Sequence, residues 1–171
     1  MKTTFDKSFA MLLKHEGGFV HHPLDKGGMT NLGITQAVWE NCIGKPCTEA
    51  DMRALTPEMV APLYKKNYWD KVRGDDLPAG IDHCVFDCAV NSGVGRAVDM
   101  LQGCVNVIVD HVIGPKTLDA ITTINPFDLI DHYTQFRLSF LKRIPTWNTF
   151  GKGWQKRVLE VSDQAKELAK S

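Results

Sequence analysis

The most constraining feature of this sequence is a segment that is apolar on almost every side. Seven apolar residues fall within positions 81–91, and at helical spacing they surround the axis: Ile81, Cys84, Val85, Phe86, Cys88, Ala89 and Val90. A helix that is hydrophobic all round has to be buried among other elements. The segment therefore predicts a helical domain assembled around one central helix.

The rest of the chain supplies helices to surround this centre. A first helix is expected to end at Glu16, before Gly17 and Gly18, and residues 19–35 break into short apolar pieces around glycines, which indicates a small β hairpin. Helical spacing and cap residues predict further helices at about residues 35–42, after Thr48, and at 56–69, 96–109, 115–121, 125–141 and 154–169. The fold class is mainly α, and 171 residues suit a single domain.

Composition narrows the classes of function. Twenty basic and twenty acidic residues give zero net charge, so no global field attracts nucleic acid or an anionic membrane. A modest basic excess within residues 137–170 fits either a solvated helical face or attraction to an anionic polymer such as a cell wall. Five cysteines form neither a disulfide framework nor the spacing of a zinc site, so no metal or other cofactor is expected.

Glu16 is the strongest candidate for chemistry. A carboxylate at the C-terminal end of a helix faces the negative pole of the helix dipole, which disfavours its ionised form and suits a general acid. Gly17 and Gly18 would let a substrate approach the backbone closely. The alternative interpretation is that Glu16 is simply the last exposed residue of its helix.

Two residues downstream complete a possible catalytic set. Asp25 lies nine residues after Glu16 in a polar turn, where a carboxylate stays ionised, and Thr30 follows with a hydroxyl that could position water. Two carboxyl groups in contrasting environments, roughly 6.5 to 9.5 Å apart, are the apparatus of an inverting glycosidase. The pattern predicts glycoside hydrolysis with Glu16 as acid.

Six further side chains are candidates for binding a sugar substrate. Aromatic rings can stack on sugar faces, although core packing explains them equally well. Asp87 and Asn91 stand four apart on one helix face, and an amide could hydrogen-bond an acetamido group or simply cap a helix end. The full set is Tyr64, Tyr68, Trp69, Asp87, Asn91 and Gln102.

Several motifs together resemble one known family, the glycoside hydrolase family 108 muramidases, which are bacteriolytic phage and prophage endolysins. The similarity covers nearly the whole chain and is carried by Glu16-Gly17-Gly18-Phe19, residues 25–35, residues 64–70, residues 85–93, Leu101-Gln102, residues 113–118 and residues 153–157.

The resemblance implies a lysozyme-like fold and cleavage of the β-1,4 bond between N-acetylmuramic acid and N-acetylglucosamine, with Glu16 as the catalytic residue. Asp25 and Thr30 are similar to an aspartate and a threonine of neighbouring phage lysozymes, although the gap before Thr30 is one residue shorter here. The resemblance also implies a catalytic half in residues 1–92 and a peptidoglycan-binding half in residues 93–171.

The expected partner is therefore the glycan strand of peptidoglycan. The sequence shows neither a signal-peptide pattern nor an apolar run of membrane-spanning length. We expect synthesis in the cytoplasm, no stable membrane insertion, and action on the wall after release by a holin or another export helper. A lytic transglycosylase, or a non-catalytic wall-binding or secretion-accessory protein, remains an alternative.

Overall fold

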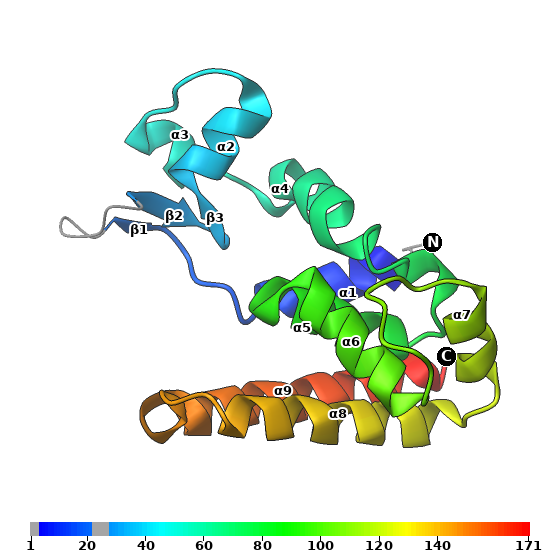
Figure 1. Ribbon diagram of the computed structural model, residues 1–171. Helices are drawn as coiled ribbons and strands as arrows, with labels where there is room; N and C mark the ends of the chain where they lie inside the picture. Colours follow the sequence, from blue (N-terminus) through cyan, green and yellow to red (C-terminus); the bar gives the residue numbers. More distant parts are fainter. Residues whose placement is uncertain (1–3, 22–27) are drawn as a thin grey trace. The chain divides into compact units, whose positions relative to one another are not determined.

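The computed structural model describes residues 4–21 and 28–171, which are mainly helical (Figure 1). The described elements are, in order, α1 (Thr4–Leu13), β1 (Val20–His21), β2 (Met29–Asn31), β3 (Ile34–Thr35), α2 (Gln36–Ile43), α3 (Glu49–Arg53), α4 (Pro57–Tyr64), η1 (Lys65–Trp69), η2 (Gly74–Asp76), α5 (Ile81–Ser92), α6 (Val94–Cys104), α7 (Pro115–Thr122), α8 (Pro126–Lys142) and α9 (Trp147–Ala169). The predicted lysozyme-like, mainly α class with a small β element after the first helix is confirmed.

The chain forms two compact units. Unit 1 combines Met1–Ser8 with Tyr68–Ser171, and unit 2 is Phe9–Asn67. The predicted catalytic half, residues 1–92, and peptidoglycan-binding half, residues 93–171, stay predictions. The helices α5 and α6, which adjoin the boundary between these halves, pack together in the core of unit 1.

Unit 2 contains an antiparallel sheet in the order β1-β2-β3. Met29 and Asn31 of β2 are buried while Thr30 between them is less so, because alternate side chains of a strand point to opposite faces. Leu32 and Gly33 join β2 to β3 with φ of 52° and 76°, so both loop residues are left-handed, as a tight hairpin requires. The Asn31 amide ties the sheet to α3 by donating to the carbonyl of Met52 at 2.8 Å.

The helices of unit 2 begin where the sequence predicts, because their signals are local. The hydroxyls of Thr35, Thr48 and Thr56 each accept a hydrogen bond from a backbone amide in the first turn of α2, α3 and α4. The helix predicted over residues 56–69 differs in its second half, where α4 gives way to the π-helical turn η1. Pro62 lacks a backbone donor and stands just before this change.

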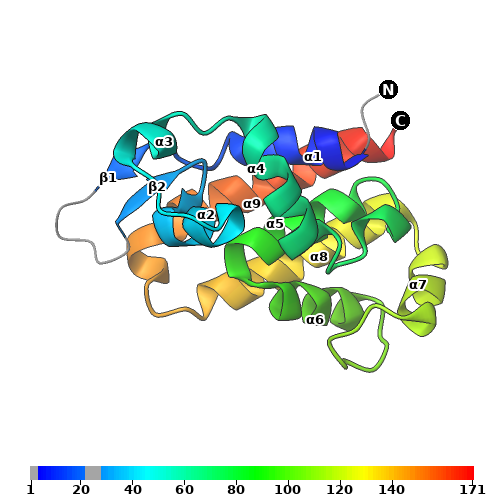
Figure 2. The ribbon, with the colours of Figure 1, turned by 90° about the horizontal axis from the view of Figure 1, so that it is seen from above.

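Unit 1 is built around α5, as its all-round apolar pattern predicts. Every residue from 81 to 89 is buried, and α6, α8 and α9 pack on this helix. The helices α8 and α9 run side by side as a long hairpin, which both views show (Figures 1 and 2). Their apolar stripes and that of α6 form one core with α5.

Several predicted helix boundaries are wrong. The helix predicted over residues 96–109 begins at Val94 and ends at Cys104. The first helix ends at Leu13 and not at Glu16; the amide of His15 bonds the carbonyl of Leu12, which is a tighter turn than an α-helix makes. The last helix begins at Trp147, seven residues before the predicted start. Gly151 and Gly153 disfavour a helix locally, which explains the late predicted start. The structure accounts for Gly151, because a β-carbon built there would lie only 2.5 Å from the ring of Trp147.

Within the described residues, no helix combines the length and the apolar character that crossing a bilayer requires.

A buried carboxyl group lies at the start of α5. Asp82 is 2% exposed, and its Oδ1 accepts hydrogen bonds from the amides of Gly80 at 2.8 Å and His83 at 2.7 Å. Burial raises the pKa of Asp82 to about 6, although these amide hydrogen bonds oppose the shift. The folded protein therefore binds a proton at Asp82 more tightly than the unfolded chain does.

We predict that Asp82→Asn changes the pH dependence of stability. Because folding raises the pKa of Asp82, its neutral carboxyl contributes to stability at pH 4, and this contribution is lost as the pH rises through 6. Between pH 4 and pH 7 the unfolding free energy of Asp82→Asn should gain about 2–3 kcal/mol relative to the wild type. Denaturant titrations measure this, with the exposed first-turn acid Asp128→Asn as control. Parallel curves for the Asp82 variant and the wild type would contradict the prediction.

Candidate functional site

Glu16 lies in unit 2, in the short segment between α1 and β1, and is half-buried. Its carboxylate faces the backbone of Gly33 in the β2–β3 turn. A β-carbon built on Gly33 would stand only 2.8 Å from Oε2 of Glu16. Since Gly33 also has a φ of 76°, both the turn and the neighbouring carboxylate require glycine at this position.

Tyr64 of α4 approaches the same β-carbon position of Gly33. Its hydroxyl oxygen would be 2.4 Å from that β-carbon, and it donates a hydrogen bond of 2.8 Å to the carbonyl of Leu32. The ring packs against Phe9 of α1 at 5.1 Å between centroids, and Tyr64 is only 2% exposed. Tyr64 therefore offers no ring face to a sugar. It holds the β2–β3 turn beside the Glu16 carboxylate, a role that its sequence position did not reveal.

The two glycines that follow Glu16 leave open space beside the backbone. Gly17 and Gly18 are exposed, and no heavy atom lies within 4 Å of a β-carbon built on either. Glu16 stands three residues beyond the end of α1, so the helix dipole acts on it less than predicted, because that effect falls off within the last turn. The ring of Phe19, three residues after Glu16, is covered by the Arg53 guanidinium at 4.0 Å.

Of the other two predicted catalytic residues, Thr30 lies within the described residues and Asp25 does not. Thr30 occupies the middle strand β2, paired with Val20 of β1 and Thr35 of β3, and its side chain is half-buried. Asp25 lies outside the described residues. The roles of Asp25 and Thr30 stay predictions.

The other predicted aromatic contacts belong to unit 1 and pack against its core. Trp69 is fully buried, edge-on to both Phe5 and Phe86 at 5.4 Å between centroids, and its indole nitrogen donates to Asp75 at 2.9 Å. Tyr68 is partly buried against the core that surrounds α5. We assign Trp69 a packing role, because a sugar needs an accessible ring face.

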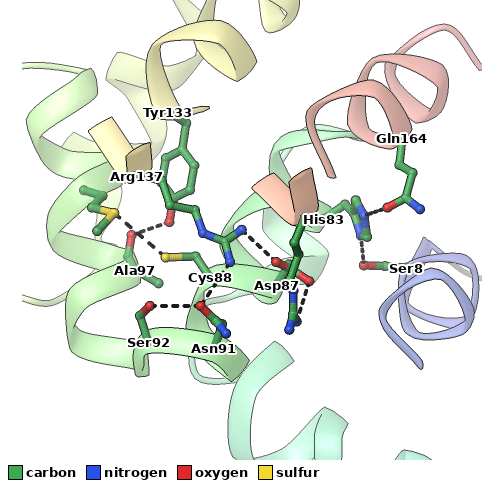
Figure 3. Close-up of polar contacts among 12 residues, drawn as sticks. Ser8, His83, Asp87, Cys88, Asn91, Ser92, Ala97, Tyr133, Arg137 and Gln164 are labelled. Carbon is green, nitrogen blue, oxygen red and sulfur yellow. Dashed lines mark hydrogen bonds and ion pairs between the residues drawn. The ribbon is translucent and has the colours of Figure 1, made fainter. Parts of the chain in front are cut away.

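Asp87 forms a buried ion pair with two guanidinium groups inside unit 1 (Figure 3). Its fully buried carboxylate accepts from Nη1 of Arg137 at 2.7 Å and from Nη2 of Arg157 at 3.0 Å. Burial by itself would raise the pKa of Asp87, but the two guanidinium groups outweigh it and hold the pKa below its usual range. Asp87 thus joins α5 to α8 and α9 and leaves no oxygen for a sugar.

Asn91 and Gln102 were predicted as substrate contacts and occupy contrasting places. Asn91 is exposed at the end of α5, and its Oδ1 accepts from Arg137 at 3.5 Å, so its position is compatible with the prediction. Gln102 is 1% exposed, and its amide binds Asp110 and Val112 in the loop after α6 and Thr117 of α7. We therefore assign Gln102 to the structure of that loop.

A buried histidine that the sequence did not single out is also structural. His83 of α5 lies within hydrogen-bond distance of Ser8 Oγ at 2.6 Å and Gln164 Oε1 at 2.9 Å, which connects three helices (Figure 3). Over the described part of the chain, no three His, Cys, Asp or Glu side chains gather as a metal site would need. The pocket of about 490 Å³ between α2 and α4, near Val38 and Leu63, contains no acidic residue.

The half-buried Glu16 beside an open glycine pair is thus carried by a mainly helical fold with a small sheet. The profile of the family described as "Glycosyl hydrolase 108" matches residues 9–93. A solved structure, that of SagA from Brucella abortus, is 44% identical in sequence and covers 98% of this chain and 97% of its own, with a TM-score of 0.84. A search of curated proteins finds no match. The chain belongs to glycoside hydrolase family 108.

We predict that Gly33→Ala lowers the unfolding free energy more than Gly44→Ala does, although both place alanine in a left-handed backbone conformation. Gly44 has a φ of 73° with nothing within 4 Å, so Gly44→Ala should lose only the strain energy of a left-handed residue, about 1–2 kcal/mol. Gly33→Ala should lose a further 1–3 kcal/mol, approximately, because its methyl group collides with Tyr64 and Glu16. Denaturant unfolding of both variants measures the difference; equal losses would contradict the geometry.

We also predict a large loss of stability on removing the buried carboxylate. Asp87→Ala should lower the unfolding free energy by about 3–5 kcal/mol, because it leaves the Arg137 guanidinium buried without its counter-ion. The control is Asp131→Ala, since Asp131 is 57% exposed in its ion pair with Lys166 and should cost less than about 1 kcal/mol. Similar losses for the two variants would refute the role of Asp87.

Proposed function

We propose that this protein is a muramidase that hydrolyses the β-1,4 bond between N-acetylmuramic acid and N-acetylglucosamine in peptidoglycan, with Glu16 as general acid. Membership of a glycoside hydrolase family supports the reaction class. The observation that carries the proposal is the position of the Glu16 carboxylate, held against Gly33 and next to the open backbone of Gly17 and Gly18.

The proposed reaction needs an acid, a base and a water molecule. Glu16 donates its proton to the glycosidic oxygen as the bond from that oxygen to the anomeric carbon breaks. Water attacks the anomeric carbon and gives its proton to Asp25, while the hydroxyl of Thr30 orients that water. The proton lost by Glu16 is recovered from solvent.

Other residues serve this reaction indirectly. Tyr64 positions the β2–β3 turn that Glu16 contacts, since its hydroxyl bonds the carbonyl of Leu32. Asn91, exposed at the end of α5, is proposed to bind an acetamido group of the glycan. Action on the wall as an endolysin, after release by a holin or another export helper, is part of the proposal.

The test is clearance of a peptidoglycan suspension. We expect wild-type protein to clear it and Glu16→Gln to reduce the rate by about 10²–10⁴-fold, because general acid catalysis contributes that much. Glu49→Gln is the matched control, since Glu49 is exposed and pairs with Arg53 within α3. Full activity of Glu16→Gln would remove Glu16 from the mechanism.

Product analysis separates hydrolysis from the transglycosylase alternative. Hydrolysis by the proposed route leaves reducing N-acetylmuramic acid ends and requires Asp25, so Asp25→Ala should lose most activity. If Asp25→Ala keeps full activity and the products carry 1,6-anhydro ends, no water attacks and the muramidase proposal fails. Mass spectrometry of the released fragments distinguishes the two products.

A further inference from the structure

The loop between α6 and α7 exposes aliphatic side chains to solvent. Ile108 is 80% exposed, more than any other large hydrophobic residue that the structure describes. Val109 is 48% exposed and Val112 is 63% exposed, so all three lie close together in one loop. Figure 2 shows this loop extending outward from the end of α6. Exposed aliphatic residues that cluster in this way mark a surface for association, whereas single ones do not.

Hydrogen bonds on the inner side of the loop fix its backbone. The side-chain amide of the buried Gln102 donates to a carboxylate oxygen of Asp110 at 2.8 Å and to the carbonyl of Val112 at 2.9 Å. The guanidinium group of Arg73 donates to the carbonyl of Ile113 at 2.9 Å. The aliphatic side chains therefore project from a preorganised backbone, which lowers the entropy lost when a partner binds.

A cavity of about 660 Å³ adjoins these side chains. It is formed by the loop and by the first turn of α7, so all of its lining belongs to unit 1. The apolar part of this lining comprises Val107, Ile108, Val112 and Pro115. The loop thus carries a projecting apolar side chain beside an apolar cavity, and two copies of such a surface can each fill the cavity of the other.

The same cavity carries one charge of each sign. Asp110 and Lys116 both line it, and both are exposed. Hydrogen bonds from the Gln102 amide and from the backbone amide of Val112 hold the pKa of Asp110 below its usual range, so this carboxyl group stays ionised. A carboxylate and an ammonium group therefore stand on the surface that the aliphatic side chains occupy.

This charge pattern favours a second copy of the chain as the partner. An anionic partner would meet the Asp110 carboxylate, and a cationic partner would meet the Lys116 ammonium group. A surface with both charges is complementary to itself, because a twofold axis can place Lys116 of each copy opposite Asp110 of the other. The zero net charge of the whole chain also removes long-range repulsion between two copies.

We infer that the loop between α6 and α7 is the contact surface of a homodimer. Each copy packs its Ile108 and Val112 against the cavity of the other, and Lys116 pairs with Asp110 across the twofold axis. One loop and one helix turn make a small interface, so the dimer is weak and depends on concentration. The inference is independent of the proposed reaction, since residues 105–117 include none of its proposed residues.

The test measures the oligomeric state of the full chain by sedimentation equilibrium over a range of concentrations. The wild type should pass from monomer to dimer as the concentration rises. Ile108→Asp should weaken dimerisation about tenfold or more, because it places a charge at the apolar centre of the contact. The matched control is Leu159→Asp, since Leu159 is 43% exposed on α9 and lies outside the loop. It should leave dimerisation unchanged.

A second arm tests the charges. Lys116→Glu brings two carboxylates together across the axis and should weaken dimerisation about tenfold. Lys142→Glu makes the same change in net charge at an exposed position of α8, so it should have little effect. Equal effects of these two substitutions would contradict the proposed pairing.

Two results would overturn the inference: a wild type that stays monomeric at every concentration, and a dimer that Ile108→Asp leaves intact. Binding assays on the monomer then identify the other occupant. If Ile108→Asp abolishes binding to phosphatidylglycerol vesicles or to insoluble peptidoglycan, the loop contacts a bilayer or the wall and not a second copy. Clearance of peptidoglycan tests the muramidase reaction separately, so the failure of either proposal is visible without the other.

Discussion

The carboxylate of Asp87 is the interaction on which the arrangement of unit 1 depends. It is the polar group at the centre of a helix that is buried on all sides, and it pairs with guanidinium groups from both α8 and α9. A buried charge that loses its partner is strongly destabilising, so α8 and α9 must present Arg137 and Arg157 to Asp87. Asp87 therefore sets which faces of α8 and α9 turn toward α5, and apolar burial around it supplies most of the stability.

In unit 2 the corresponding constraint is Gly33, which has no side chain. The tight β2–β3 turn needs a left-handed residue there, and the absence of a side chain admits both the Glu16 carboxylate and the Tyr64 hydroxyl. A catalytic acid must be held within a fraction of an ångström, and elements with locked side chains do this better than a free loop. Glu16 lies in a loop, but its carboxylate rests against a turn that Tyr64 anchors to α4.

The accuracy of sequence reasoning followed the range of the interactions involved. Thr35, Thr48 and Thr56 predicted three helix starts because a cap acts within one turn. The start of α9 is an exception, since Gly151 indicates a helix end by itself and only the structure shows that the ring of Trp147, four residues earlier, occupies the space a side chain there would need. The exposure of aromatic residues was the hardest property to predict. Helical spacing does not distinguish a buried ring, such as Trp69, from an exposed ring, such as Phe150.

By itself the sequence determined the mainly α class, the central position of α5 and the candidate acid Glu16, since all of these follow from periodicity and short motifs. Only the tertiary structure decided which side chains are accessible. Tyr64 proved to support the β2–β3 turn, and Gln102 proved to anchor a loop. The exposed rings include Phe127 and Phe136 of α8 and Phe150 of α9. The physical reason is that accessibility depends on residues distant in the chain, and no local pattern records them.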